Sequence, residues 1–150
     1  MTDLQHLVDD ADRDGIQKLV VGAVVYHDDR VLILRRSSGD DFLPGIEELP
    51  SGGVDDGEDL RSALARELAE EIGWSGPLIL DRDFVAVFDY LSGSGRKARQ
   101  CTVALSGNAC PIVLSDEHES YRWITLDELS DSDLTDETVQ AIHDWAATRR

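Results

Sequence analysis

The chain has 150 residues, a length that suits one domain with a single hydrophobic core. Hydrophobic residues make up 41% of it, and the formal net charge is −17, from 31 acidic against 14 basic residues. A surface this acidic repels the phosphates of nucleic-acid polymers and of anionic membranes, so neither is an expected partner. A small phosphorylated ligand is compatible with this charge only if metal cations bridge the two negative partners.

The N-terminus and the cysteines indicate a soluble, cytoplasmic protein. The segment MTDLQHLVDDADRDG is polar and acidic, unlike a secretory signal peptide. The longest apolar run, LVVGAVVY at 19–26, is too short to span a bilayer. Cys101 and Cys110 match no usual zinc spacing, and one pair is too few for a disulfide scaffold. We therefore expect both cysteines to be reduced and structural.

Apolar periodicity predicts a mixture of helices and strands, separated by loops where Gly, Pro, Ser and Asp gather. In chain order the predicted elements are a short helical turn with a loop (1–16), a β-hairpin around residues 27–30 (18–36), a loop (37–44), a short extended piece (45–51), a helix (58–72), two strands joined by a glycine-rich basic loop (78–91 and 98–107), a strand (121–125), a short helix beginning at 126 and a C-terminal helix (134–150). Strands on both sides of a central helix, followed by a closing helix, predict an α/β fold with a mixed sheet between helical layers.

The helix at 58–72 carries the strongest pattern in the chain. Four apolar residues recur at every fourth position and form an apolar stripe: Leu60, Leu64, Leu68 and Ile72. Asp55 or Asp56 is expected to cap the start of this helix, and Gly73 to end it.

Three glutamates share this helix, and their phase relative to the apolar stripe is informative. On a helical wheel with Glu67 at zero, the stripe runs from about 20° to about 140°. Glu71 falls at about 40°, inside the stripe, and Glu70 at about −60°, beside it. Glu67 and Glu71 are therefore predicted to face the body of the protein, with Glu70 flanking them. A merely solvated acidic helix is the alternative.

Carboxylates that face inward need protons, basic partners or metal ions. The spacing of these three glutamates gathers them around one point, and no nearby lysine can neutralise them. Mg²⁺ or Mn²⁺, which prefer oxygen ligands, are the natural solution. The glycine-rich turns SGG and DG before the helix can bring backbone carbonyls close to the same ligand.

These residues resemble the Nudix box, G-x5-E-x7-R-E-U-x-E-E-x-G-U, in which U is a bulky aliphatic residue. The matching stretch runs over 23 residues, from Gly52 through Glu58 and the segment RELAEEIGW at 66–74, with every fixed charged and glycine position filled. Trp74 stands where Ile, Leu or Val is usual, and Ser51 stands where many members have another Gly. The likeness extends over roughly residues 18–148. It implies an α/β/α sandwich, with residues 1–17 as an extension and 18–150 as the Nudix domain.

The resemblance implies metal-dependent hydrolysis of a nucleoside diphosphate linked to another moiety. Glu67, Glu70 and Glu71 would hold Mg²⁺ or Mn²⁺, with the backbone carbonyl of Ser51 as a further ligand. Arg66 would position Glu67, although the wheel puts Arg66 on the outer side, so that its guanidinium must reach back along the helix.

The catalytic base is left open between Glu67 and a glutamate of the stretch SDEHESYRW, since several family members recruit a base or metal ligand from such a loop. We favour Glu117 over Glu119 there. His118 is interpreted as a solvated loop residue. Glu58 is expected to fix the loop by hydrogen bonding, or simply to favour the helix N-terminus.

Substrate specificity lies outside the box. Arg35 ends a strand close to the loop before the box and is a candidate phosphate contact. Tyr90 lies 16 residues beyond Trp74, an offset that resembles diadenosine polyphosphate hydrolases, although plain strand packing explains it as well. The favoured substrate is a (deoxy)nucleoside triphosphate or its oxidised form, followed by a dinucleoside polyphosphate and a nucleotide sugar.

Two other classes remain as alternatives. One is an enzyme like isopentenyl diphosphate isomerase, which has a Nudix-like fold and an essential cysteine, but no motif surrounds either cysteine here. The other is a regulatory domain that only binds nucleotides, for which the intact box is unexpected. Because many members of the family form dimers, a homodimer is compatible with the resemblance.

Overall fold

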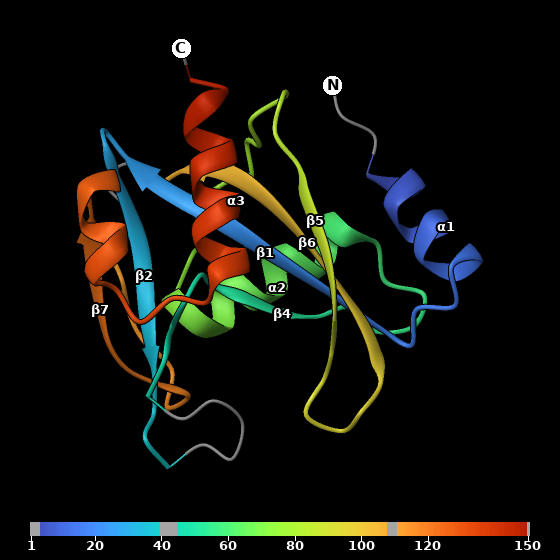
Figure 1. Ribbon diagram of the computed structural model, residues 1–150. Helices are drawn as coiled ribbons and strands as arrows, with labels where there is room; N and C mark the ends of the chain where they lie inside the picture. Colours follow the sequence, from blue (N-terminus) through green and yellow to red (C-terminus); the bar gives the residue numbers. More distant parts are fainter. Residues whose placement is uncertain (1–3, 40–44, 108–110, 150) are drawn as a thin grey trace.

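The computed structural model describes residues 4–39, 45–107 and 111–149. Its elements are α1 (Gln5–Arg13), β1 (Lys18–His27), β2 (Arg30–Arg36), β3 (Glu47–Glu48), β4 (Ser51–Gly53), α2 (Leu60–Ile72), β5 (Ala86–Leu91), β6 (Lys97–Ser106), β7 (His118–Ile124), the 3₁₀ helix η1 (Leu126–Asp131) and α3 (Asp136–Ala147). Figure 1 shows these elements along the chain. No described helix is long and apolar enough to cross a bilayer.

The strands of the described residues form one seven-stranded mixed sheet. Its main path runs β3-β2-β1-β6-β5, with β4 paired to β1 and β7 paired to β2. β1 and β6 are parallel over nine residue pairs, whereas the other strand pairs are antiparallel. The hairpin predicted for 18–36 is confirmed, because β1 and β2 pair on either side of a turn in which Asp28 has a φ of 55°.

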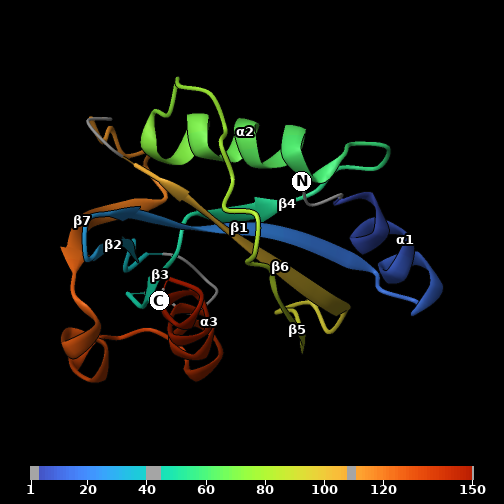
Figure 2. The ribbon, with the colours of Figure 1, turned by 90° about the horizontal axis from the view of Figure 1, so that it is seen from above.

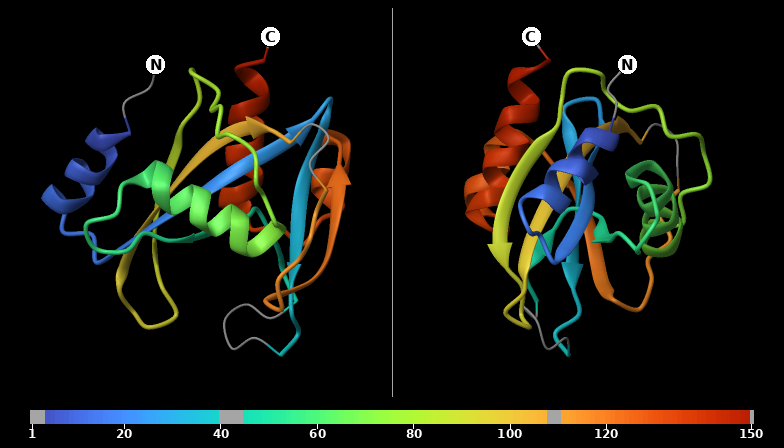
Figure 3. Two further views of the ribbon diagram at one scale, coloured as in Figure 1. Left: turned by 180° about the vertical axis from the view of Figure 1, so that it is seen from behind. Right: turned by 90° about the vertical axis from the view of Figure 1, so that its right-hand side faces the viewer.

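Helices cover both faces of this sheet, as the sequence predicts. Figure 2 and the right-hand view of Figure 3 show α2 on one face and α3 on the other. The period-2 alternation of β1 divides its side chains between two hydrophobic cores. Val21, Ala23 and Val25 pack toward α2 and the Leu7 side chain of α1, whereas Val24 packs toward α3. The result is an α/β/α sandwich in which α2 lies directly over the strands that carry the loop before it.

Local hydrogen bonds explain where α2 begins and ends. Asp59, and not Asp55 or Asp56, is its N-cap, because the Asp59 carboxylate accepts the N–H of Ser62 at 2.7 Å. Asp55 instead begins a turn in which its carbonyl accepts the N–H of Glu58. The helix ends at Gly73, as predicted, with a φ of 72° that only glycine adopts without strain.

Several predicted boundaries are wrong, among them the start of the helix predicted for 58–72, which begins at Leu60. The strand predicted for 78–91 begins only at Ala86, and within 78–85 only Leu80 forms an isolated bridge to the sheet. The strand predicted for 121–125 begins earlier, at His118, where it pairs with Arg36 of β2. The C-terminal helix is shorter, 136–147, because Thr135 caps its start and Thr148 its end. Part of the predicted loop at 37–44 and Cys110 lie outside the described residues, whereas Cys101 is a free, buried thiol.

Candidate metal and catalytic site

The site is built where β4 meets α2. The sheet holds the short strand β4, whose Gly52 pairs with Val21 of β1. The carboxylate of Glu67 lies directly against Gly52, so that a Cβ at this position would overlap it. Gly52 is therefore required because a carboxylate must sit against the backbone, and not for an unusual φ.

Arg66 fastens the loop to the helix. Its guanidinium donates to both carboxylate oxygens of Glu58 at 3.0 and 2.8 Å, to the carbonyl of Gly53 at 3.0 Å and to Oε1 of Glu67 at 2.7 Å. The side chain does reach back from the outer side of α2. Glu58 also accepts the N–H of Asp55, and the hydrogen bonds from Arg66 and Asp55 hold the pKa of Glu58 at about 2. This network fixes the orientation of Glu67.

Glu71 is the carboxylate taken furthest out of water. Its side chain is 4% exposed, and its Oε1 accepts the N–H of Ser51 at 2.8 Å. Burial, aided by the charges of Glu48, Glu67 and Glu117, raises the pKa of Glu71 to about 9. An ionised Glu71 therefore requires a positive partner at neutral pH.

The other two glutamates of α2 differ in exposure. Glu67 is 15% exposed, and burial raises its pKa further than Arg66 lowers it, with additional contributions from Glu70 and Glu117. Glu70 is 60% exposed and lies 3.9 Å from Arg66. The wheel thus predicts the order of burial correctly, with Glu71 and Glu67 inward and Glu70 at the rim.

Glu117 approaches this pair from a different segment. The chain before β7 is tied to the end of α2, because Val113 donates to the carbonyl of Ile72 and Ser115 to that of Glu71. The charge of Glu117 raises the pKa of both Glu67 and Glu71. Glu119, the alternative in the sequence, is an exposed residue within β7.

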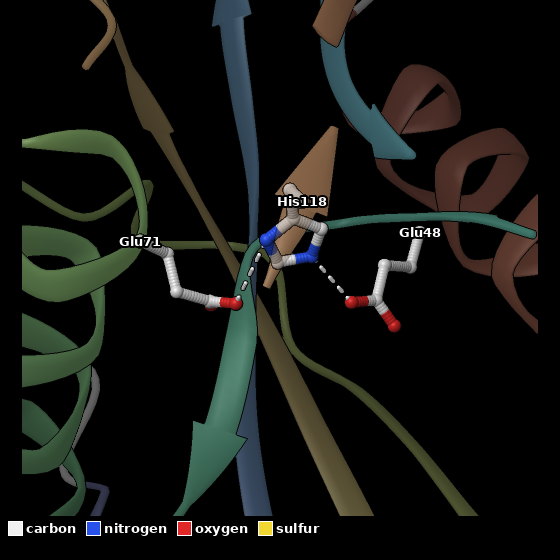
Figure 4. Close-up of side chains that lie close together, drawn as sticks. All are labelled: Glu48, Glu71 and His118. Atoms are coloured by element: carbon white, nitrogen blue, oxygen red, sulfur yellow. Dashed lines mark hydrogen bonds and ion pairs between the residues drawn. The ribbon is translucent and has the colours of Figure 1, made fainter. Parts of the chain in front are cut away.

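His118 is not the solvated residue that we expected. Its side chain is 1% exposed and lies between two glutamates, with Nε2 2.7 Å from Oε2 of Glu48 and Nδ1 3.7 Å from Oε2 of Glu71 (Figure 4). Glu48 in turn lies 3.4 Å from Nη1 of Arg36. One ligand atom from each of Glu48, Glu71 and His118 lies within 4.8 Å of the others, close enough to surround a metal ion.

Sequence reasoning missed Glu48 and His118 as members of the site. Strict alternation along β7 would place His118 on the same face of the sheet as the buried Ile124. The register of β7 on β2 shifts between Arg35 and Arg36, so alternation does not predict the face that His118 takes. Glu48 lies in a strand of only two residues, too short for a periodic pattern. The only available signal is an acidic residue just before the glycine-rich turn.

The two predicted substrate contacts lie in different surroundings. Arg35 donates to the carbonyl of Gly45 at 2.6 Å and to Asp133 at 3.0 Å, and also lies 3.6 Å from Glu47. Tyr90 is half-buried on β5, and its ring lies 5.8 Å from that of Phe88. Burial raises the pKa of Tyr90, with a smaller contribution from the charge of Glu48, which links it electrostatically to the site.

The donor set fits a divalent metal ion. Several carboxylates converge, Glu71 and Glu67 have raised pKa values, and Nδ1 of His118 is buried without a hydrogen-bond partner. A cation bound among these buried oxygen and nitrogen atoms would give Nδ1 a partner and the carboxylates a positive charge.

Comparisons with known proteins agree with this geometry. A family model of the NUDIX domain matches residues 17–145. The nucleoside triphosphatase NudI of Salmonella typhi is 30% identical over 128 residues, which cover 79% of this chain and 89% of that protein. The MutT protein from Methanosarcina mazei Go1 aligns with a TM-score of 0.76 at 23% identity, covering 89% of this chain and 95% of that one. The MutT NUDIX hydrolase from Burkholderia pseudomallei aligns with a TM-score of 0.68 at 27% identity, covering 84% and 95%. The chain therefore belongs to the Nudix family and is a hydrolase that acts on phosphoric anhydride bonds.

Proposed function

We propose that this enzyme is a pyrophosphohydrolase of a (deoxy)nucleoside triphosphate or its oxidised form, with Mg²⁺ or Mn²⁺ as its cofactor. The observation that carries the proposal is the buried carboxylate of Glu71, which accepts the N–H of Ser51. Burial and the neighbouring carboxylates raise its pKa to about 9, although this hydrogen bond lowers it. Such a group favours a divalent cation. The similarity to a nucleoside triphosphatase supports the substrate class. We also propose that the catalytic domain spans 18–150 and that residues 1–17 are an extension.

Glu67, Glu70 and Glu71 would hold the ions, together with the backbone carbonyl of Ser51. The ions would polarise the phosphate oxygens, neutralise the leaving group and make a bound water more acidic. The protein contributes prior orientation. Arg66 holds Glu67 against Gly52, so the carboxylate needs little rearrangement when substrate arrives.

The proton of the attacking water would pass to a carboxylate. Glu67 and Glu117 are the two candidates, and both belong to the same electrostatic cluster. A raised pKa brings the carboxyl of Glu67 closer to the operating pH, as general-base catalysis requires. Glu117 is an exposed residue on the turn just before β7, outside α2.

Substrate contacts are proposed for Arg35 and Tyr90. Tyr90 offers a half-buried ring beside Phe88, on which a nucleobase can stack. Arg35 would supply a cation to a phosphate, in exchange for its ion pair with the exposed carboxylate of Asp133.

The test is a screen of nucleotides with the wild-type enzyme in Mg²⁺ and in Mn²⁺, with products identified by chromatography. We expect a nucleoside triphosphate to yield the monophosphate and pyrophosphate, and chelation of the metal to abolish turnover. Glu67→Gln should lower kcat by about 10²–10⁴-fold. Absence of turnover on every triphosphate, with rapid cleavage of a dinucleoside polyphosphate, would replace the proposed substrate by the second candidate, which Tyr90 favours.

A further inference from the structure

His118 has one ring nitrogen engaged and one without a hydrogen bond. Nε2 lies 2.7 Å from Oε2 of Glu48, a hydrogen-bond distance. Nδ1 is buried, makes no hydrogen bond and points toward Glu71 at 3.7 Å. Figure 4 shows the imidazole between the two carboxylates, one reached from β3 and the other from α2.

The partner of Nε2 determines the tautomer. Glu48 lies 3.4 Å from Nη1 of Arg36, with which it forms an ion pair. A carboxylate only accepts hydrogen bonds, so Nε2 must carry the proton of the neutral imidazole. The lone pair of Nδ1 is then left facing Glu71. In metal sites this pairing is common, because a histidine ligand usually donates its other N–H to a carboxylate.

The distance between Nδ1 and Glu71 suits a shared ion. A single cation bonded at about 2.1 Å to each atom can bridge such a gap. Mg²⁺ strongly prefers oxygen ligands, whereas Mn²⁺, Co²⁺ and Zn²⁺ also accept imidazole.

We propose that Nδ1 of His118 is a ligand to a divalent transition-metal ion shared with Glu71, and that Glu48 orients the ring for this role. The proposal rests on the proposed metal-dependent function and makes it more specific. A nitrogen ligand makes this position favour Mn²⁺ or Co²⁺ over Mg²⁺. Glu48 acts through His118 and is a positioning residue.

The experiment is pulsed electron paramagnetic resonance of the full chain loaded with less than one equivalent of Mn²⁺. A directly bound imidazole nitrogen modulates the electron spin echo. We expect this nitrogen modulation in the wild-type protein and in His27→Gln, since the side chain of His27 is 48% exposed and does not belong to the cluster of Glu48, Glu71 and His118. We expect its loss in His118→Gln. Modulation that persists in His118→Gln, or that is missing from the wild type, would overturn the assignment.

Two further measurements keep the test independent of the folding of His118→Gln. Long-range ¹H–¹⁵N spectra of the metal-free wild type should show the proton of His118 on Nε2, and a proton on Nδ1 would refute the argument. Glu48→Leu should weaken Mn²⁺ binding by about 10–100-fold, and unchanged affinity would refute the role of Glu48. Turnover of nucleotides with Mn²⁺ but without nitrogen modulation would refute the ligand and leave the proposed function standing. Nitrogen modulation without any turnover would support the ligand and refute the proposed function alone.

Discussion

Replacing Glu71 with Gln should stabilise the metal-free protein, although it removes a site residue. The pKa of Glu71 is raised from 4.5 to about 9, chiefly by burial. Below pH 4.5 the carboxyl is protonated in both the folded and the unfolded chain, so its ionisation does not lower the free energy of unfolding. As the pH rises toward 9, only the unfolded chain releases the proton, and the free energy of unfolding falls by about 1.4 kcal/mol per pH unit.

At pH 7 the accumulated loss for the wild type is about 3 kcal/mol. Gln has the shape of a protonated Glu, and its amide oxygen can still accept the N–H of Ser51. In a chelator, Glu71→Gln should therefore exceed the wild type in free energy of unfolding by about 3 kcal/mol at pH 7. The difference should vanish near pH 4.5 and reach its maximum above pH 9.

Metal should reverse this order. A cation at 1,000 times its Kd stabilises the wild type by about 4.1 kcal/mol, more than the advantage of about 3 kcal/mol that the variant has at pH 7, whereas the variant lacks the buried charge that binds the cation. The assay is denaturant unfolding from pH 5 to pH 9, with and without Mn²⁺. Glu119→Gln, at an exposed position of β7, is the matched control and should follow the wild type. A Glu71→Gln protein no more stable than the wild type in chelator across this range would refute the reasoning.

Three further predictions follow from the site and its supporting helix. Glu117→Gln should lower kcat for nucleotide hydrolysis by about 10²–10⁴-fold, and Glu119→Gln should not; equal losses would mean that the loop is misassigned. Gly52→Ala should lower kcat by about 100-fold through displacement of the carboxylate that lies against it, while circular dichroism stays unchanged. Full activity would show that this carboxylate needs no fixed position. Asp59→Ala should cost about 1 kcal/mol in urea unfolding through loss of the α2 cap. Asp55→Ala should cost less, and the reverse order would contradict the observed cap.

Local chemistry made α2 predictable. The four-residue spacing of its apolar stripe and the stop at Gly73 depend only on helical geometry, so the phase of Glu67 and Glu71 follows from the sequence. The cap was predicted wrongly because several aspartates precede the helix. The carbonyl of Asp55 accepts the N–H of Glu58 in a turn before the helix. Asp59 is therefore the aspartate whose side chain reaches the N–H of Ser62 and caps α2.

The shortening of the 78–91 strand has a similar cause. The segment at 78–80 has the composition of a strand. However, Nη1 of Arg61 in α2 donates a hydrogen bond to the carbonyl of Leu78 at 2.8 Å. This contact comes from a distant part of the chain and competes with pairing to the sheet. The strand propensity of a segment reflects only its own residues, so it does not account for a hydrogen bond from another element.

Local patterns in the sequence predict the helix that carries the carboxylates, the glycine beside them, a divalent cation among them and the layered α/β architecture. Each of these depends on spacing within a short segment. Only the packed chain shows that Glu48 and His118 lie beside Glu71. Their meeting with Glu71 requires β3, β7 and α2 to be packed together, and the register shift in β7 selects the face from which the imidazole enters.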